Sequence, residues 1–217
     1  TQAQTMFYGN PATEPKSFLG LATRYSSFSG GGNAQNVITA GGADATSNAS
    51  VYLVCWGDNT VYCPFPKGSK AGLIHEDLGE QTVYDSSNRM QAYATRYQWK
   101  NGLVVKDWRY VVRICNIKVS DLLAGTTTQT TAVGTNLIKL MARSIYRIPN
   151  MAMGRCAFYM NRTVHSGLAV QAMDRSQAVL KVNEGLTQFG QPHSWLSFLG
   201  VPCRKVDALL NTEAVVS

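Results

Sequence analysis

The stretch TVYDSSNRMQAYATRYQWKNGLVVKDWRYVVRICNIKV, residues 82–119, carries the strongest β-strand pattern in the chain. Within it, Gln91–Lys100 alternates well, and Asn101-Gly102 is the strongest short signal for a hairpin turn. We therefore predict a ribbon in which Gln91–Lys100 pairs with Leu103–Val119. The second strand, of about seventeen residues, is far longer than an average strand of roughly five or six. A ribbon of this length, with charges among its apolar side chains, favours a broad sheet that contacts neighbouring molecules.

The segments upstream of the ribbon have simpler patterns. Thr1–Tyr8 is typical of the end of a helix, stopped by Gly9-Asn10-Pro11. Ser26–Ser50 is rich in Gly, Ser, Asn and Ala and predicts an extended loop region. Val51–Trp56 is continuous, β-branched and aromatic, and we predict that it forms a hairpin with Thr60–Cys63.

A polar connector, Lys67–Gly79, is expected to lead from that hairpin into the ribbon. After the ribbon, a Thr-rich loop, Gly125–Thr131, precedes the clearest helix of the sequence. Its body is Asn136–Arg147 with Thr135 as N-cap, and its apolar stripe consists of Leu137, Ile138, Leu140, Met141 and Ile145.

Basic residues lie off that apolar stripe at spacings of four, at Lys139, Arg143 and Arg147. This row is either a solvated helix surface or a contact with a neighbouring subunit or with DNA. Beyond the helix, Arg155–Val164 predicts a strand that Leu168–Ala172 continues after a turn. Short strands and turns follow from Val179, so the order of elements suggests an α+β fold.

Composition narrows the classes of protein further. The 217 residues fit one large domain or two small ones, and the 45% of hydrophobic residues argue against disorder. Charged residues make up only 15%, well below the usual quarter, so part of the surface is expected to be covered by partner subunits. The net charge of +7 suits a polyanionic partner, although the basic residues are scattered. No apolar stretch approaches the length of a membrane span.

Motifs for catalysis, cofactors and metals are missing from the sequence. Neither a nucleophile elbow, a phosphate-binding loop nor a dinucleotide fingerprint occurs in the required context. The densest group of ligand-type residues, His75-Glu76-Asp77, is better explained as a polar loop than as a metal site. The five cysteines are widely spaced and are expected to be buried, reduced thiols. We therefore predict no catalytic, cofactor-binding or metal-ligating residue, and no enzymatic activity.

Several stretches, in order along nearly the whole chain, resemble the major capsid proteins of tailed bacteriophages with the Hong Kong 97-type fold. The likeness is to a subfamily of some short-tailed phages, and none of the matching stretches is a catalytic motif. The stretches are Phe7–Pro11, Phe18–Tyr25, Val51–Trp56, Tyr62–His75 with its run Pro66–Leu73, Asp107–Ile114, Phe158–Val164, Phe198–Arg204 and Asp207–Glu213.

The resemblance implies a peripheral domain, with the end of a long helix and a long β-ribbon, and an axial domain around a central sheet. Residues 1–25 would be the end of the peripheral-domain helix and the loop after it, and 26–81 a Gly-rich loop and β-hairpin region. Residues 82–124 would be the peripheral-domain ribbon, and 125–217 the axial-domain helix and strands. These domains are expected to be discontinuous. The N-terminal arm and extended loop, which lie upstream in members of the family, are absent from this sequence, and we expect the parent protein either to be processed or to continue upstream.

As a capsid subunit, the protein would assemble with copies of itself into pentamers and hexamers that enclose double-stranded DNA. The resemblance also implies scaffolding, portal or cement proteins as further partners, non-specific contact with packaged DNA, and no membrane. Assembly would take place in the cytoplasm of the bacterial host, and the mature protein would be part of the virion. Two alternatives remain at this point, a β-rich phage tail or adhesin-type structural protein and a hydrolase with a dispersed active site.

Overall fold

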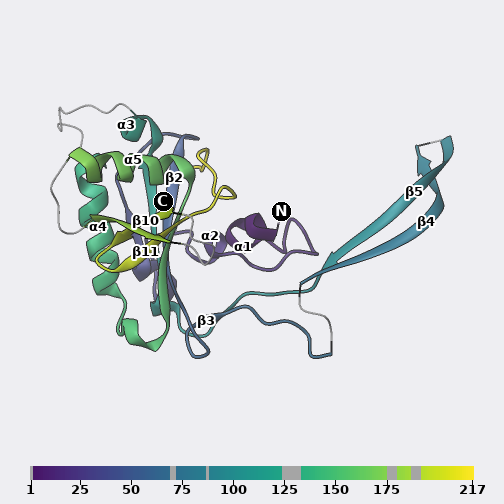
Figure 1. Ribbon diagram of the computed structural model, residues 1–217, viewed down its shortest axis with the longest axis horizontal. Helices are drawn as coiled ribbons and strands as arrows, with labels where there is room; N and C mark the ends of the chain where they lie inside the picture. Colours follow the sequence, from purple (N-terminus) through teal and green to yellow (C-terminus); the bar gives the residue numbers. More distant parts are fainter. Residues whose placement is uncertain (1, 69–71, 87, 124–132, 175–179, 187–191) are drawn as a thin grey trace. The chain divides into compact units, whose positions relative to one another are not determined.

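The computed structural model describes residues 2–68, 72–86, 88–123, 133–174, 180–186 and 192–217 (Figure 1). The chain divides into two compact units. The larger consists of Thr1–Tyr62 and Val105–Ser217, and the smaller of Cys63–Val104. The predicted Thr-rich loop at Gly125–Thr131 lies outside the described residues.

A central sheet organises the larger unit, with the strand order β1-β7-β2-β8-β11-β10-β9. The two contacts of β1 with β7 and of β11 with β8 are parallel, whereas β2 runs antiparallel to both β7 and β8. β3 pairs with β2 and β6 beside this path. The strands are β1 (Val37–Thr39), β2 (Asn48–Trp56), β3 (Val61–Tyr62), β6 (Val104–Val105), β7 (Val111–Lys118), β8 (Arg155–Met160), β9 (Leu180–Leu186), β10 (Pro192–Phe198) and β11 (Val201–Lys205).

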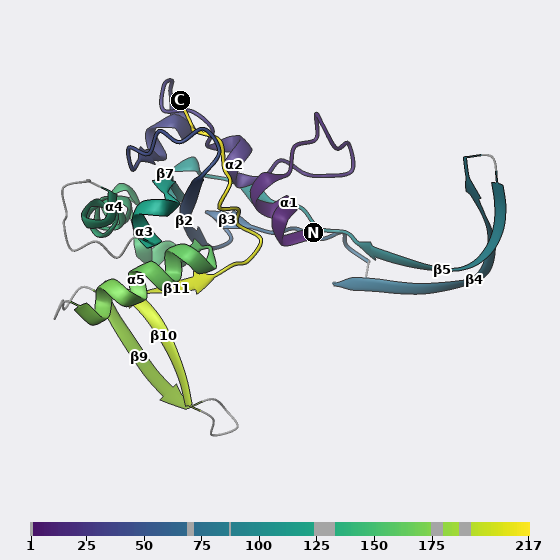
Figure 2. The same cartoon turned by 90° about the horizontal axis from the view of Figure 1, so that it is seen from above.

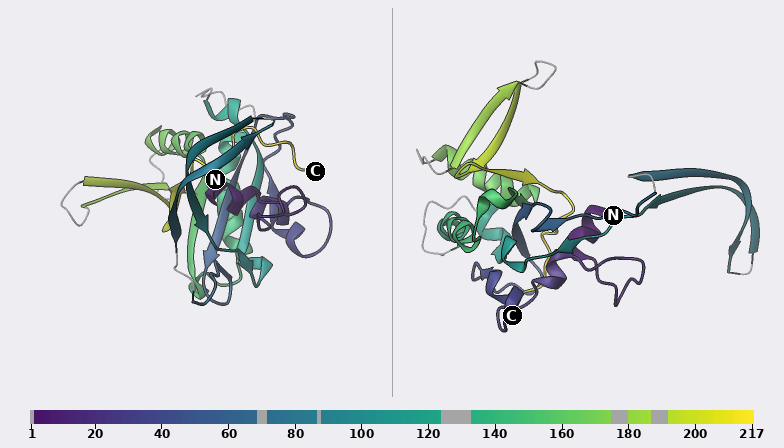
Figure 3. Two further views of the ribbon diagram at one scale, coloured as in Figure 1. Left: turned by 90° about the vertical axis from the view of Figure 1, so that its right-hand side faces the viewer. Right: turned by 90° about the horizontal axis from the view of Figure 1, so that it is seen from below.

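Helices cover both faces of the sheet: α4 and α5 lie on one face, and α1 and α2 on the other (Figure 2). The antiparallel hairpin of β9 and β10 extends from the edge of the sheet (Figure 3). The mixed order of helices and strands agrees with the α+β prediction. The helices are α1 (Gln2–Tyr8), α2 (Leu21–Arg24), α3 (Val119–Leu123), α4 (Val133–Arg147) and α5 (Arg162–Asp174), with 3-10 turns η1 (Gly32–Asn36), η2 (Trp108–Tyr110) and η3 (Met151–Met153).

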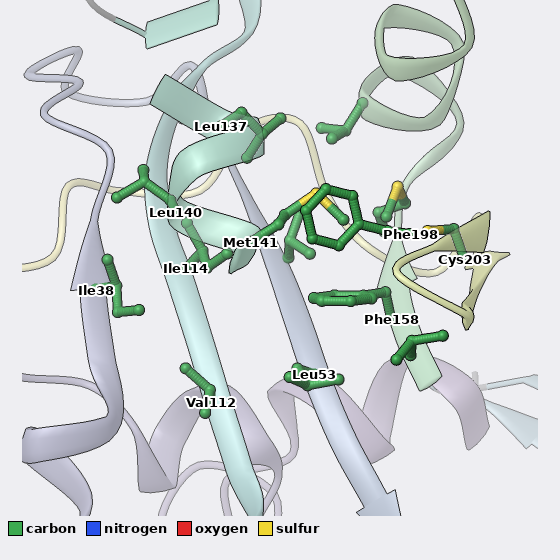
Figure 4. Close-up of a cluster of buried hydrophobic side chains, with 14 of the residues drawn as sticks. Ile38, Leu53, Val112, Ile114, Leu137, Leu140, Met141, Phe158, Phe198 and Cys203 are labelled. Carbon is green, nitrogen blue, oxygen red and sulfur yellow. The ribbon is translucent and has the colours of Figure 1, made fainter. Parts of the chain in front are cut away.

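The main core lies between the sheet and α4 (Figure 4). Leu137 and Met141 of α4 are fully buried and point toward Ile114 of β7. Further along the sheet, the rings of Phe158 on β8 and Phe198 on β10 meet edge to face, with centroids 5.9 Å apart. The sequence placed α4 correctly by its apolar stripe, although the helix begins two residues before the predicted N-cap, Thr135.

α1 ends where the sequence predicted, at a position that only glycine can occupy. The amide of Gly20 donates to the carbonyl oxygen of Gly9 over 2.8 Å. A Cβ on Gly20 would lie 2.6 Å from the carbonyl oxygen of Phe7, and one on Gly9 would lie 2.2 Å from that of Phe18. The two glycines therefore let two backbone segments touch, which fixes α1 against the start of α2.

The smaller unit contains a two-stranded antiparallel ribbon, but its strands differ from those predicted. β4 (Leu73–Asp85) pairs with β5 (Asn88–Trp99), and the register closes between Asp85 and Asn88. The predicted turn at Asn101-Gly102 is wrong, because β4 reverses into β5 between the register partners Asp85 and Asn88, and Ser86 adopts a positive φ of 51°. The predicted connector at Lys67–Gly79 is also wrong beyond residue 72, since β4 begins at Leu73.

The segment expected to be the second ribbon strand, Leu103–Val119, leaves the ribbon altogether. The Asp107 carboxylate accepts a hydrogen bond from the Arg109 amide (3.0 Å) and supports the turn η2 at Trp108–Tyr110. After this turn, β7 enters the central sheet, where its first seven residues are buried. An apolar run of this kind belongs in a sheet that is covered on both faces, and the exposed ribbon offers no such cover.

Two further local predictions are corrected. β3 does not return along β2 as a hairpin, since the two strands share one parallel pair, Trp56 with Val61. The segment Leu168–Ala172, predicted as a strand, belongs to α5. The side chain of Asn161 caps this helix by accepting from the Val164 amide over 2.8 Å, and such a cap starts a helix directly after a strand.

Candidate assembly surfaces

One face of the ribbon gathers several exposed apolar side chains. Tyr93 and Tyr97 of β5 are 81% and 63% exposed, and Tyr84 of β4 is 70% exposed. Trp99 and its register partner Leu73 lie at the open end of the ribbon. We call these five residues, with His75, the aromatic face of the ribbon.

A β-bulge puts these side chains on the same face. The register shifts by one residue between Asp77 and Gly79, and Gly79 adopts a φ of 67° that favours glycine. Side chains alternate between the two faces of a strand, so the extra residue reverses the alternation beyond it. Leu73 and His75 before the bulge therefore share a face with Tyr84 after it, and the ring of His75 lies 5.1 Å from that of Tyr97.

The ribbon has little to stabilise it within its own chain. Every described side chain of β4 and β5 is exposed or half-buried. A free two-stranded ribbon is only marginally stable in water, whereas covering a large apolar side chain contributes about 1.5–3 kcal/mol. The aromatic face is therefore suited to contact with another protein surface.

A buried ion pair in the larger unit fixes the elements that surround the sheet. The Arg113 guanidinium of β7 donates to the Glu213 carboxylate over 2.8 Å, and both side chains are nearly inaccessible, at 5% and 6% exposure. Arg113 also donates to the carbonyl oxygens of Ala22 (3.2 Å) and Tyr25 (2.8 Å). One guanidinium therefore connects the central sheet to α2 and to the C-terminal segment.

The Glu213 carboxylate completes this buried anchor by accepting from two hydroxyl groups. Tyr8 of α1 and Ser50 of β2 donate one hydrogen bond each to it. The Leu210 amide in turn donates to the Tyr8 hydroxyl over 3.0 Å. Thus α1, the sheet and the C-terminal segment are held by charge-assisted hydrogen bonds, which are stronger than neutral ones.

The electrostatics of the anchor follow from its burial. Desolvation, and then the charge of Glu213, raise the pKa of Tyr8 far above its ordinary value, so this phenol stays protonated and donates. Burial also raises the pKa of Tyr52, whose ring lies 5.6 Å from the Arg113 guanidinium carbon. This anchor was not predicted from the sequence, although a lone Arg within the apolar run Val111–Cys115 indicates a buried acidic partner.

The group His75-Glu76-Asp77 is not a loop, as predicted, but part of β4. Neighbouring side chains of a strand point to opposite faces, and Glu76 pairs with Arg96 at 3.8 Å on the face opposite His75. Among the described residues, no group of three His, Cys, Asp or Glu side chains could hold a metal ion. Over the same residues, no helix is long and apolar enough to cross a membrane.

Four cysteines are buried or half-buried, as predicted, and Cys63 is exposed, contrary to the prediction. Burial raises the pKa of Cys203 to about 12 and that of Cys115 to about 11. These thiols are therefore protonated near neutral pH and unreactive.

In the predicted basic row, Lys139 and Arg143 are exposed on α4, and Arg147 donates to the carbonyl oxygens of Gln35 and Val37.

Comparisons with known proteins agree with this architecture. A family model described as major capsid protein GP7 matches residues 1–217. A chain in the cryo-EM structure of bacteriophage epsilon15 is 32% identical, with a TM-score of 0.60. The match covers 99% of the present chain and 62% of the epsilon15 chain, so the present chain spans less than two thirds of that neighbour's length. No curated protein sequence is similar enough to count as a relative.

These findings confirm the predicted resemblance and the Hong Kong 97-type α+β fold. The alternatives of a tail or adhesin-type protein and of a hydrolase receive no support from them.

Proposed function

The chain belongs to the family of major capsid protein GP7, and on that premise we propose that it is part of a subunit of an icosahedral phage shell. Copies of the subunit would form pentamers and hexamers through head-to-tail contacts that close into a shell. The shell would enclose double-stranded DNA. The role is structural rather than enzymatic.

The observation that carries this proposal is the aromatic face of the ribbon. A shell subunit makes many contacts with identical neighbours, so each contact can be weak. Tyr84, Tyr93 and Tyr97 offer large, rigid side chains that gain contact area at a low cost in conformational entropy. In this proposal, the ribbon belongs to the peripheral domain, and the central sheet with α4 and α5 to the axial domain.

The virion would be the site of the mature protein, after assembly in the cytoplasm of the bacterial host. Scaffolding, portal and cement proteins would be its further partners, each of which meets a capsid lattice at some stage of its assembly. The ribbon face accounts for contacts between copies of the chain, and these other contacts would use surfaces outside it.

The test compares assembly by the full-length protein and by two matched double variants. Tyr84→Ser with Tyr93→Ser removes two rings from the aromatic face. The control, Val83→Ser with Met90→Ser, alters a register pair on the opposite face of the same ribbon. Negative-stain electron microscopy and sedimentation velocity report on closed shells and rings.

We expect shells from the wild-type protein and from the control, and folded but unassembled subunits from the tyrosine variant. Circular dichroism shows whether the variants are folded. Wild-type levels of shells from the tyrosine variant would contradict the role of the aromatic face. Small uniform particles from the wild-type protein would contradict the shell itself.

A further inference from the structure

The outer surface of α4 carries three basic side chains in a row, on the side opposite the core. Lys139, Arg143 and Arg147 are exposed, whereas Leu137 and Met141 are fully buried. A helix rises 1.5 Å per residue, so the row spans about 12 Å along the helix axis. We call these three residues the basic row.

The charges of the basic row lack a partner of opposite sign in the part of the chain that the structure describes. No carboxylate there lies within ion-pair distance of Lys139 or Arg143. Burial, and then the neighbouring charge of Arg143, lower the pKa of Arg147, which indicates repulsion between the two guanidinium groups. Like charges four residues apart destabilise a helix, so an external anion would relieve a cost that the isolated chain bears.

The sequence around the row is also free of acidic residues. Residues 122–173, about a quarter of the chain, contain five Lys and Arg but no Asp or Glu. An even distribution of the 13 acidic residues would place about three of them there. By contrast, β4 alone contains four acidic residues, Glu76, Asp77, Glu80 and Asp85. This stretch therefore carries a net charge of +5 out of +7 for the whole chain, because it lacks acidic residues. Of its basic residues, Arg162 of α5 is paired with Asp207 over 2.8 Å, whereas Lys139 and Arg143 of α4 have no such ion pair among the described residues.

We infer that the outer surface of α4 binds the phosphate backbone of double-stranded DNA through Lys139, Arg143 and Arg147. This inference rests on the proposed function, in which the shell encloses such DNA, and it assigns the surface that meets it. Phosphates follow each other every 3.4 Å of axis along one strand, so a row of about 12 Å spans about three or four of them. Lys and Arg side chains that contact phosphates bind without regard to base sequence.

An acidic surface of a neighbouring subunit is the competing partner, and the distribution of charge favours DNA. An ion pair with an acidic patch on a neighbouring protein needs only one cluster of basic residues. Acidic residues elsewhere on the subunit do not weaken such a contact. A surface against densely packed DNA gains from the absence of acidic residues over its whole area, because each one would repel nearby phosphates. The stretch that lacks Asp and Glu, residues 122–173, extends in the sequence far beyond the two turns of helix that carry the basic row.

The experiment measures binding of a 30-base-pair duplex of random sequence to soluble, unassembled full-length subunits by fluorescence anisotropy over a series of salt concentrations. The test variant is Lys139→Gln with Arg143→Gln, which leaves the hydrogen bonds of Arg147 in place. The matched control is Lys16→Gln with Lys67→Gln, which removes the same charge from other exposed positions. A third variant, Lys139→Arg with Arg143→Lys, keeps the charge and shows whether substitution itself disturbs the helix.

Each phosphate contact contributes about 0.9 to the slope of log K against log salt concentration. We therefore expect the slope of the test variant to fall by about 2 relative to the wild type, while the control and the charge-conserving variant keep the wild-type slope. An equal slope in the test variant and the wild type would overturn the inference. A test variant that binds DNA normally but no longer forms shells would also overturn it and would identify α4 as a contact between subunits.

Electron microscopy of the same preparations separates this inference from the proposed function. Wild-type subunits that form shells but do not bind the duplex would overturn the DNA surface alone. Wild-type subunits that bind the duplex but never form shells or rings would contradict the proposed function, whatever the slopes.

Discussion

The buried pair of Arg113 and Glu213 allows a quantitative prediction about stability. In Glu213→Ala, the Arg113 guanidinium stays buried without its counterion, and the hydroxyls of Tyr8 and Ser50 lose their acceptor. Removing one partner of a buried ion pair costs about 3–5 kcal/mol. Because Arg113 keeps the carbonyl oxygens of Ala22 and Tyr25 as acceptors, we expect the lower end, about 3 kcal/mol.

Equilibrium unfolding in urea, followed by circular dichroism, measures this loss in the full-length subunit. With a slope of about 2–3 kcal/mol per molar urea, the midpoint should fall by about 1–1.5 M. Glu14→Ala removes an exposed acidic residue and should change stability by less than about 0.5 kcal/mol.

A double variant tests the cause of the loss. Arg113→Met with Glu213→Leu removes both charges, and apolar pairs often replace buried ion pairs at little cost, so this variant should be more stable than Glu213→Ala. A loss below about 1 kcal/mol in Glu213→Ala, or a double variant less stable than the single one, would refute the reasoning.

Three further measurements check the structure elsewhere. Gly20→Ala forces a Cβ within 2.6 Å of a backbone oxygen of Phe7, and a cost of about 2 kcal/mol should lower the melting temperature by about 4–8 °C; an unchanged melting temperature would contradict the close approach. In soluble subunits at pH 8, an aromatic disulfide reagent should modify the exposed Cys63 rapidly and the other four, buried or half-buried cysteines only after unfolding. Rapid loss of two or more thiols would contradict the burial of those four cysteines. Burial, and then the charge of Lys205, lower the pKa of His165, so the unfolded chain binds a proton more readily and the free energy of unfolding should fall as the pH drops below about 6.5. His165→Asn should flatten this part of the stability-against-pH curve, and an unchanged slope would contradict the reasoning.

Local patterns in the sequence predicted the elements that local chemistry determines. α4 follows from the spacing of its apolar residues, and α1 ends at Gly9 because the chain turns there against Gly20. The strand at Val51–Trp56 was found because a buried strand is continuously apolar. The family resemblance added the class of protein, since its stretches depend on the order of residues along the chain.

The local patterns did not predict which distant segments pair with each other. Asn101-Gly102 has the right composition for a hairpin turn, yet the partner of β5 precedes it as β4, whose many polar residues hide the alternation. A ribbon exposed on both faces has no buried side to impose a period of two, so its sequence resembles that of a loop. The helix at Leu168–Ala172 was missed because its start depends on a single cap, Asn161.

By itself, the sequence determined the α+β class, the positions of α4 and of the buried strand at Val51–Trp56, the excess of positive charge and the family. These properties follow from composition and short-range spacing, which act between residues close in the chain. Only the tertiary structure decided that a bulge at Gly79 places Tyr84 on the same face of the ribbon as Tyr93, and that Arg113 meets Glu213 across 100 residues. Strand register and burial bring such residues together, and both depend on which distant segments exclude water from each other.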